Sequence, residues 1–472
     1  MHFQRPFDPV VSFRNSQGEP ARGTLSTVQR RSMVLEVYNP YSIVQVSEVL
    51  SEVTIRLGDR AVYQGKAVVV SLLNTGLMAM VSLTLIDEWN DLGSGQWDAA
   101  SVSSAVQRFI QDWDGRARVK PAYQEVVNDL RGYLSEVTRW LDQADAMAGL
   151  PRNAQGKVRD DVFYEIAAPL LTRGAEYQKQ FEAVAATLSP EEDIIHRAFA
   201  QAAIHPLVLR APFVYRTFAK PLGYAGDYEM VNQILGDPRQ GPTMYFELVN
   251  FMFLQASVAR AHRNRVNILH TRLRDVALRS LKERRTMRIL NVGCGPVGEL
   301  QRLASDNVPL DGLDIVLMDF SEETLVYARK VIDDAAAKGG KHFQRVTLRN
   351  ESVHQLLKRT ASRSPDATAN RDAGENGFDF IYCAGLFDYL SDKACARLIQ
   401  YFHDQLRSGG ELLVTNVHAA NPERHWMEHF MEWYLIYRDE ATMRRLFPQA
   451  GQGVATYTDE TGVNLFAEVT KP

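Results

Sequence analysis

The sequence predicts a multidomain chain: a small N-terminal β-barrel, a helical middle region and a C-terminal Rossmann-like α/β domain that ends in an antiparallel hairpin. Three observations lead to this fold class. Short β-type runs fill residues 1–92, helical periodicity fills residues 93–240, and residues 241–472 alternate strands and helices around a glycine turn. The length of 472 residues suits three such units at roughly 150 residues each.

Composition and charge narrow the classes of function. Apolar residues make up 45% of the chain, and the formal net charge of −4 argues against a protein built mainly to bind nucleic acid. The three cysteines, Cys294, Cys383 and Cys395, have no metal-ligand spacing, so we expect neither a metal site nor a disulfide framework. The first residues lack the apolar segment of a signal peptide, and we expect a cytoplasmic protein.

An uncharged stretch at residues 67–86 is long enough to span a bilayer. Asn74, Thr75 and Gly76 interrupt it at the centre, and β-branched residues crowd its first half. Two strands joined by a turn therefore explain the stretch better than a membrane span.

The first segment contains four clear β runs, at residues 33–37, 53–57, 66–73 and 77–86, and these runs predict the barrel. Their order resembles that of PilZ domains, the bacterial receptors for cyclic-di-GMP. Where that family has its ligand motif, Thr27, Gln29 and Ser32 replace the acid or amide, the serine and the glycine, and the spacing of the paired arginines is absent. These departures argue against binding of cyclic-di-GMP and favour a role in packing or in forming a homodimer.

The middle region has apolar residues at three- and four-residue spacing through 103–113, 123–145 and 163–188, which predicts helices. Ser189 and Glu192 form a capping-box pattern around Pro190, so a further helix should begin there and end near His205 and Pro206.

A different kind of segment, KPLGYAGDYEMVN, covers residues 220–232. Two glycines, two tyrosines and an acid between helices suit neither a helix nor a strand, and loops of this composition often carry function. Tyr224, Asp227 and Tyr228 are candidates to reach over the mouth of the α/β domain. The alternative is a connecting turn whose aromatic side chains pack.

The α/β domain begins with a buried strand at residues 289–292, followed by the turn GCGPVG and a helix. Gly293 and Gly295 allow the backbone to pass close to a ligand. A second strand ends in Asp319, where a carboxylate can accept both hydroxyls of a ribose. The turn departs from the dinucleotide pattern and resembles motif I of the class I S-adenosylmethionine (SAM)-dependent methyltransferases, with Asp319 at the position of their ribose-binding acid.

This resemblance implies SAM as the cofactor and places further contacts. Cys294 lies in the turn, and Phe320 follows the acid. A third strand at residues 345–352 would bring Glu351 and Ser352 to the adenine, and a fourth at 378–385 would bring Cys383 and Gly385 beside the sulfonium. Residues 360–377 are polar and predict a loop, a helix should run from 391 to 407, a fifth strand lies at 411–418, and the terminal hairpin spans 454–471.

Four segments resemble a narrower family, the methyltransferases that make the extracellular factor 3-hydroxypalmitic acid methyl ester. These segments are residues 220–232, 258–269, 291–296 and 378–390. The resemblance covers about residues 190–472. It implies a SAM-dependent O-methyltransferase that esterifies a 3-hydroxy fatty acid and so makes a signal for quorum sensing.

The candidate catalytic residues are Tyr224, Asp227 and His418, as polar anchors for the acceptor. A fatty carboxylate is ionised at neutral pH and needs no general base. If the acceptor were a hydroxyl or an amine, Asp227 or His418 would have to take its proton.

Candidate substrate contacts lie on the segment 220–232 and on two expected helices. Tyr228 comes from that segment. On the expected helix at residues 246–281, one of Arg260, Arg263 and Arg265, with Arg263 as our candidate, would meet the methionine carboxylate of SAM or an acidic substrate; the alternative is a solvated basic face. A helix expected after Asn421 and Pro422 carries an aromatic stripe that would line an acyl groove or, alternatively, pack in the core. The stripe comprises Trp426, Phe430, Trp433, Tyr434 and Tyr437.

Two other functions compete with the fatty-acid reading. One is methylation of another small molecule or of a protein. The other is a regulatory protein in which a PilZ-like barrel senses a ligand and the α/β domain only binds SAM. The intact glycine turn and Asp319 favour an enzyme, and the altered barrel motif weakens the sensor.

Overall fold

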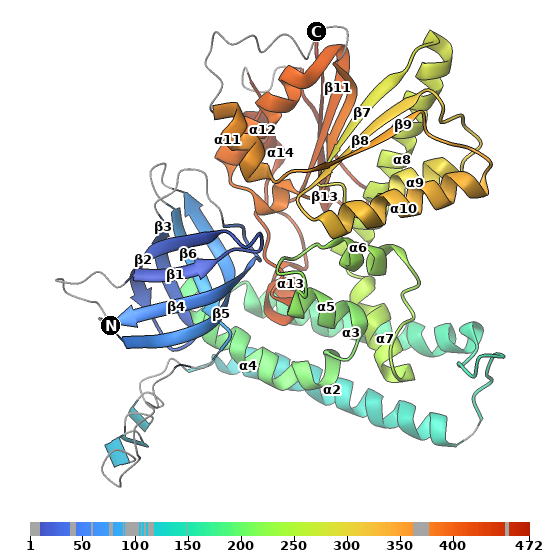
Figure 1. The fold of residues 1–472 in the computed structure, drawn as a ribbon. Coiled ribbons are helices and arrows are strands. Elements are labelled where there is room, and N and C mark those ends of the chain that lie inside the picture. Colours follow the sequence, from blue (N-terminus) through green and yellow to red (C-terminus); the bar gives the residue numbers. More distant parts are fainter. Residues whose placement is uncertain are drawn as a thin grey trace.

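The computed structural model of the chain describes residues 10–37, 44–57, 60–74, 79–87, 89, 103–104, 106–107, 110–111, 118–147, 149–361, 377–448 and 453–472. Within them, a barrel, a layer of helices and an α/β domain lie against one another (Figure 1). The predicted fold class is confirmed. The predicted helix at 103–113 lies largely outside the described residues.

The barrel is closed and antiparallel, with its strands in the order β1-β2-β3-β6-β5-β4. Every second residue of β3 and β6 is buried, as the two-residue period of a strand requires. Two of the strands, β1 and β2, come in addition to the four runs expected from the sequence. The strands are β1 (Val10–Arg14), β2 (Pro20–Val28), β3 (Ser32–Val37), β4 (Val49–Leu57), β5 (Arg60–Asn74) and β6 (Ala79–Leu85).

The uncharged stretch forms neighbouring strands of this barrel. β5 and β6 pair antiparallel, from Ala67 opposite Leu85 to Asn74 opposite Ala79, so the predicted strand pair is confirmed. The turn itself, residues 75–78, lies outside the described residues. Where the structure describes the chain, no helix is both long enough and apolar enough to cross a membrane.

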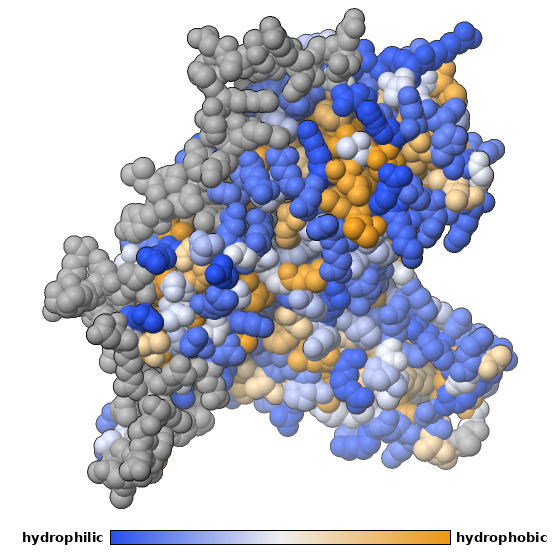
Figure 2. Space-filling model, in the orientation of Figure 1, coloured by the Kyte–Doolittle hydropathy of each residue, from blue (hydrophilic) through white to orange (hydrophobic). Residues whose placement is uncertain are grey.

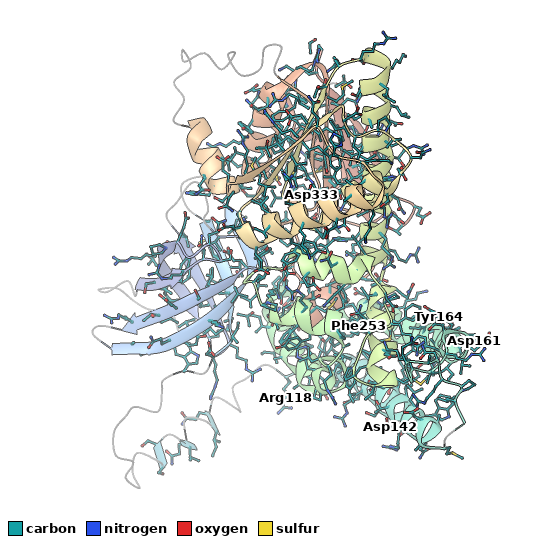
Figure 3. The ribbon with its side chains drawn as sticks, turned by 45° about the vertical axis from the view of Figure 1, so that its right-hand side comes forward. Arg118, Asp142, Asp161, Tyr164, Phe253 and Asp333 are labelled. Carbon is teal, nitrogen blue, oxygen red and sulfur yellow. The ribbon has the colours of Figure 1, made fainter. Side chains whose placement is uncertain are left out.

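The middle region is helical as predicted, and it lies beneath the α/β domain (Figures 1 and 3). The capping box at Ser189 and Glu192 is present. The helix that it begins does not end at His205: it continues through Pro206 to Val208, and the Leu209 N–H still reaches the His205 carbonyl at 3.0 Å. The helices are α2 (Pro121–Ala146), α3 (Asp160–Ala185), α4 (Pro190–Val208), α5 (Pro212–Ala219), α6 (Tyr228–Leu235) and α7 (Met244–Leu254).

The α/β domain has a seven-stranded sheet in the order β12-β13-β11-β10-β7-β8-β9. The strands β7 to β11 are parallel, whereas β13 pairs antiparallel with both β11 and β12, so the terminal hairpin is confirmed. The strands are β7 (Met287–Val292), β8 (Leu313–Asp319), β9 (Arg345–Asn350), β10 (Phe378–Cys383), β11 (Leu406–Val417), β12 (Ala455–Thr458) and β13 (Asn464–Thr470).

Helices cover both faces of this sheet. One buried apolar cluster packs α8, α9 and α10 on one face, and a second packs α11, α12 and α14 on the other. At the edge, β9 is largely exposed, and Figure 2 shows an apolar patch over the region of β8 and β9. The helices are α8 (Ser257–Glu283), α9 (Gly298–Ser305), α10 (Glu322–Lys338), α11 (Val353–Ala361), α12 (Asp392–Gln405), α13 (Arg424–Met431) and α14 (Glu440–Arg445).

Three boundaries differ from expectation. The helix predicted at 246–281 is two helices, α7 and α8, which are interrupted after Leu254. The helix predicted after Asn421 ends at Met431 because Glu432 takes a left-handed conformation, so the last three aromatic residues of the stripe lie beyond it. Gly409 and Gly410 belong to β11 rather than to a helix end. Most of the predicted polar loop, residues 362–376, lies outside the described residues.

Candidate functional site

The glycine turn lies at the carboxyl edge of the sheet, where β7 ends. Gly293 and Gly295 have φ angles of +66° and +53°, in the left-handed region that favours glycine. The Gly293 N–H donates to the Met318 carbonyl at 2.9 Å, which ties the turn to β8. A Cβ added to Gly295 would meet no heavy atom within 4 Å, so the turn faces open space.

Asp319 stands beside this turn at the end of β8 and is only 9% exposed. Its carboxylate accepts the N–H of Ser321 at 3.0 Å and, at a longer 3.4 Å, the N–H of Gly295. Burial raises the pKa of Asp319 to about 6, although these N–H donors lower it. Further donors, such as two hydroxyl groups, would stabilise the charged form.

A cavity lies over this edge, and several parts of the chain form its walls. The sheet supplies the turn, Asp319 and the residues after β10. The loop before α6, the helices α6, α8 and α9, and the barrel supply other parts of the wall. Among the lining residues are Gln17, Gln45, Val46, Tyr224, Tyr228, His262, Arg265, Gly293, Cys294, Gly295, Glu299, Asp319, Phe320, Glu351, Tyr382, Gly385, Leu386 and Tyr389.

Two opposite charges are buried in this cavity. Arg265 of α8 is 6% exposed, and among the described residues its Nη1 atom has no hydrogen-bond partner. Glu299 of α9 is also 6% exposed and accepts a hydrogen bond from the Tyr382 hydroxyl at 2.8 Å. Burial raises the pKa of Glu299 and lowers that of Arg265. A cation and an anion in one cavity suit a zwitterion, such as the amino-acid end of a ligand.

The predicted loop residue Tyr224 lies at the cavity. Its ring packs edge-on against Phe320, with centroids 4.9 Å apart, and burial raises the pKa of its hydroxyl, so the proton stays on. Tyr228 also lines the cavity, and its hydroxyl donates to Glu323 of α10 at 2.7 Å. The loop before α6 therefore covers the end of β8. Residues 228–232, which the sequence predicted to form neither a helix nor a strand, belong to α6, so that part of the prediction is wrong.

Other predicted polar residues have structural partners away from the cavity. Asp227 caps α6 by accepting the Met230 N–H at 2.8 Å, and it pairs with Arg216 at 2.8 Å. His418 pairs with Glu440 at 3.2 Å. The structure thus places Asp227 next to the lining residues and His418 beyond the end of β11, facing α14.

Three further candidates also lie elsewhere. Arg263 donates to the carbonyl of Leu254 at 2.9 Å and holds the junction of α7 and α8. Ser352 caps α11 and borders a second, polar pocket beside the main cavity. Cys383 is fully buried in the core of the sheet, whereas the neighbouring Gly385 lines the cavity.

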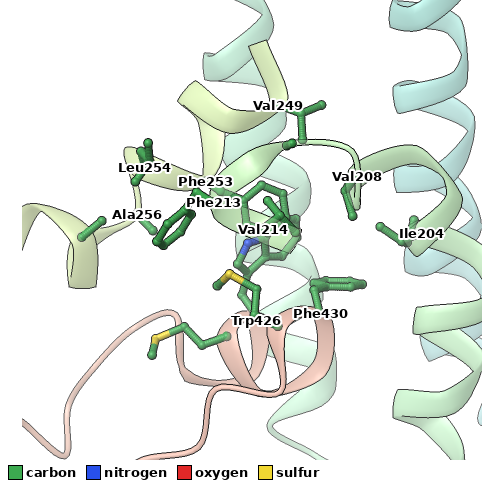
Figure 4. Close-up of a cluster of buried hydrophobic side chains, with 14 of the residues drawn as sticks. Ile204, Val208, Phe213, Val214, Val249, Phe253, Leu254, Ala256, Trp426 and Phe430 are labelled. Carbon is green, nitrogen blue, oxygen red and sulfur yellow. The ribbon is translucent and has the colours of Figure 1, made fainter. Parts of the chain in front are cut away.

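The aromatic stripe packs in the core. Trp426 and Phe430 are 3% and 0% exposed, and their ring centroids lie 4.7 Å apart among side chains of the helical region (Figure 4). Tyr437 packs against the same cluster, with Arg424 4.8 Å above its ring. The core interpretation, which the sequence left open, describes their positions.

Several lining residues were not selected from the sequence, each for an identifiable reason. Arg265 was one of three arginines considered on its helix, but Arg263 was selected, and on a helix their two-residue spacing points the two side chains in different directions. Glu299 directly follows the last glycine of the turn, and this position could have indicated that it lines the cavity. Gln17 and Gln45 come from the barrel, and their sequence context does not indicate that the barrel reaches the site.

Comparison with known proteins identifies the α/β domain. Residues 283–454 match the family model described as "Methyltransferase domain". This part of the chain is a methyltransferase domain. The match is consistent with SAM as the cofactor, which confirms the expectation from the glycine turn. Comparison with curated proteins found no match.

The methyltransferase domain and its neighbours also resemble solved structures. A possible exported protein from Bordetella parapertussis has 18% identity and a TM-score of 0.41, over 65% of this chain and 97% of that one. The magnesium protoporphyrin IX methyltransferase of Synechocystis with bound S-adenosylhomocysteine (SAH) has 9% identity and a TM-score of 0.33, over 58% and 99%. The N-methyltransferase NodS of Bradyrhizobium japonicum in complex with SAH has 13% identity and a TM-score of 0.30, over 52% and 98%. At these values the likenesses carry no argument about substrate.

The residues of the cavity fit SAM. Asp319 suits the ribose hydroxyls, and Phe320 and Glu351 line the same cavity beside it. The partnerless Nη1 of Arg265 suits the carboxylate of the methionine moiety, and Glu299 suits its ammonium group. The open space beside Gly295 leaves room for the ligand to approach the protein backbone of the turn.

Proposed function

We propose that this chain is a SAM-dependent O-methyltransferase that esterifies the carboxylate of a 3-hydroxy fatty acid. One observation carries the proposal. The two segments with the most specific resemblance to the fatty-ester methyltransferases, residues 220–232 and 378–390, border the same cavity as the glycine turn and Asp319. The product would be a methyl ester of the kind that the resembling family makes as a signal.

The chemistry asks little of the protein beyond binding and orientation. When bound, SAM supplies an activated methyl group for transfer to an oxygen nucleophile. A fatty carboxylate, with a pKa of roughly 4–5, is ionised at neutral pH and needs no base. Alignment of the reacting atoms can supply roughly 7–11 kcal/mol of the barrier.

Side chains of the cavity suit this role. Leu386, Val46 and the ring of Tyr389 offer apolar walls that keep water away from the carboxylate. Burial raises the pKa values of Tyr224 and Tyr389, so both hydroxyls keep their protons and act as donors toward an anion. His262 is a poor base, because its burial and the charge of Arg265 lower its pKa to about 3. Because His262 is a poor base, the cavity favours an acceptor that is already ionised.

The test uses SAM labelled in its methyl group and a panel of 3-hydroxy fatty acids, fatty acids and hydroxylated or amine acceptors. We expect label in the organic phase with the 3-hydroxy acids, and loss of that label when Asp319 is replaced. Transfer to the amines or alcohols alone would reject the carboxylate as acceptor. Binding of SAM without transfer to any acceptor would favour the sensor alternative.

A further inference from the structure

The N-terminal barrel reaches into the catalytic cavity. Gln45 and Val46, from the segment that leads into β4, line it together with Leu386 and Tyr389 from the segment after β10. Val46 belongs to a small buried cluster with Val68 of β5 and Tyr434. The chain after Tyr434 returns to the same region, where the Ile436 N–H donates to the Asp388 carbonyl at 2.7 Å. Gln45 and Val46 therefore bring the barrel to the cavity wall that Leu386 and Tyr389 also line, while Gln17 brings it to the pocket beside Phe320 and Ser321.

Several contacts fix the barrel in this place. The Val49 N–H donates to the Gly223 carbonyl at 2.7 Å, so the barrel holds the loop that carries Tyr224. The hydroxyl of Ser47, which is fully buried, accepts the Tyr434 N–H at 2.5 Å. On another face, Arg197 of α4 donates to Thr84 of β6 at 2.9 Å. These hydrogen bonds thus fix the barrel in place as part of the cavity wall.

A single buried carboxylate holds the barrel segments at the cavity. Glu48 is 2% exposed and accepts the Gln45 N–H at 2.6 Å. Its other oxygen accepts the N–H of Ser16 at 2.7 Å and the Ser16 hydroxyl at 2.6 Å. Ser16 precedes Gln17, the other amide that the barrel brings to the cavity. Glu48 therefore sets the position of both segments at once.

The side chain of Gln45 is half-buried in this wall, and within the described part of the chain its amide has no hydrogen-bond partner. A primary amide offers two donors and one acceptor, so it can both donate to a carboxylate and accept from a hydroxyl. We propose that Gln45 binds the hydroxyl beside the acceptor carboxylate and so selects 3-hydroxy acids, with Glu48 as its positioning residue. This inference rests on the proposed function, and it makes the barrel a specificity element of the enzyme.

The test compares 3-hydroxyhexadecanoic acid with hexadecanoic acid on the full chain. We expect Gln45→Ala to lower kcat/KM for the hydroxy acid by about three- to tenfold, the range of one neutral hydrogen bond, mainly through KM. For the plain acid, kcat/KM should stay unchanged. The matched control is Gln64→Ala, because Gln64 is exposed on β5 and lies outside the cavity lining.

The positioning role of Glu48 has its own readout. Glu48→Gln keeps an oxygen for Ser16 and loses the acceptor for the Gln45 N–H. It should therefore bring kcat/KM for the hydroxy acid closer to kcat/KM for the plain acid, while the Kd for SAM stays unchanged. If Gln45→Ala leaves the ratio of kcat/KM for the two acids unchanged, or if the wild type is equally efficient on both acids, the inference is overturned. The proposed function would still stand. If the wild type methylates neither acid, the proposed function fails and the inference falls with it.

Discussion

Replacing Asp319 with asparagine should move stability and cofactor affinity in opposite directions. Burial raises the pKa of Asp319 from 3.8 to about 6 in the folded chain. The folded chain therefore binds this proton more tightly than the unfolded chain does. The resulting stabilisation of the fold is fully present below pH 3.8 and is lost as the pH rises through about 6. At neutral pH, where the carboxylate is charged, a pKa difference of this size lowers the free energy of unfolding by about 3 kcal/mol. Asparagine removes the buried charge but keeps one oxygen for the Ser321 N–H, so the free energy of unfolding should rise by about 1–3 kcal/mol.

Affinity for SAM should fall in the same variant. The carboxylate is placed to accept two ribose hydroxyls, and a hydrogen bond to a charged group is worth about 1.5–3 kcal/mol. An amide retains one weaker acceptor, so we expect a loss of about 2–4 kcal/mol, which is about 30- to 1,000-fold in Kd. Urea unfolding without cofactor at pH 7.5 and calorimetric titration with SAM measure the two effects. A variant that loses stability, or binds SAM with nearly unchanged Kd, would refute the reasoning.

Three more outcomes follow from the cavity and its surroundings. The Kd for SAM should rise as the pH falls below about 6, because protonated Asp319 accepts hydroxyls poorly; a flat calorimetric profile from pH 5 to 8 would contradict this. Arg265→Met should weaken SAM binding with little loss of stability, whereas Arg263→Met should lower the melting temperature and leave Kd alone, because Arg263 only holds helix carbonyls. Trp426→Ala should cost about 3–5 kcal/mol in urea unfolding through the cavity it leaves; a change in acceptor preference without that cost would place Trp426 in the acyl site.

Local pattern was enough to predict most of the α/β domain. Its strands are short apolar runs bounded by glycines and acids, and Asp319 and the turn lie adjacent because parallel strands end at one edge. Strand β2, PARGTLSTV, has the opposite character. Its proline, glycine and hydroxyl residues give no strand signal, and its place is set by pairing with β1 and β3.

The site was predictable where a local motif marks it. Tyr224 and Gly385 were selected because each belongs to a short segment of distinctive composition, and both line the cavity. Arg265 was one of three arginines on one helix, and only packing decides which of them turns inward. The amide of Gln45 is held at the cavity by contacts between segments nearly 400 residues apart, such as that of Ser47 with Tyr434. Contacts of this kind cannot be predicted from the local sequence.

The most direct test of the account is a crystal structure of the full chain with SAH. We predict the nucleoside across the carboxyl edge of the sheet, with both ribose hydroxyls within about 3 Å of the Asp319 carboxylate and the amino-acid carboxylate at Arg265. A ligand bound elsewhere, or one whose ribose does not contact Asp319, would contradict the account.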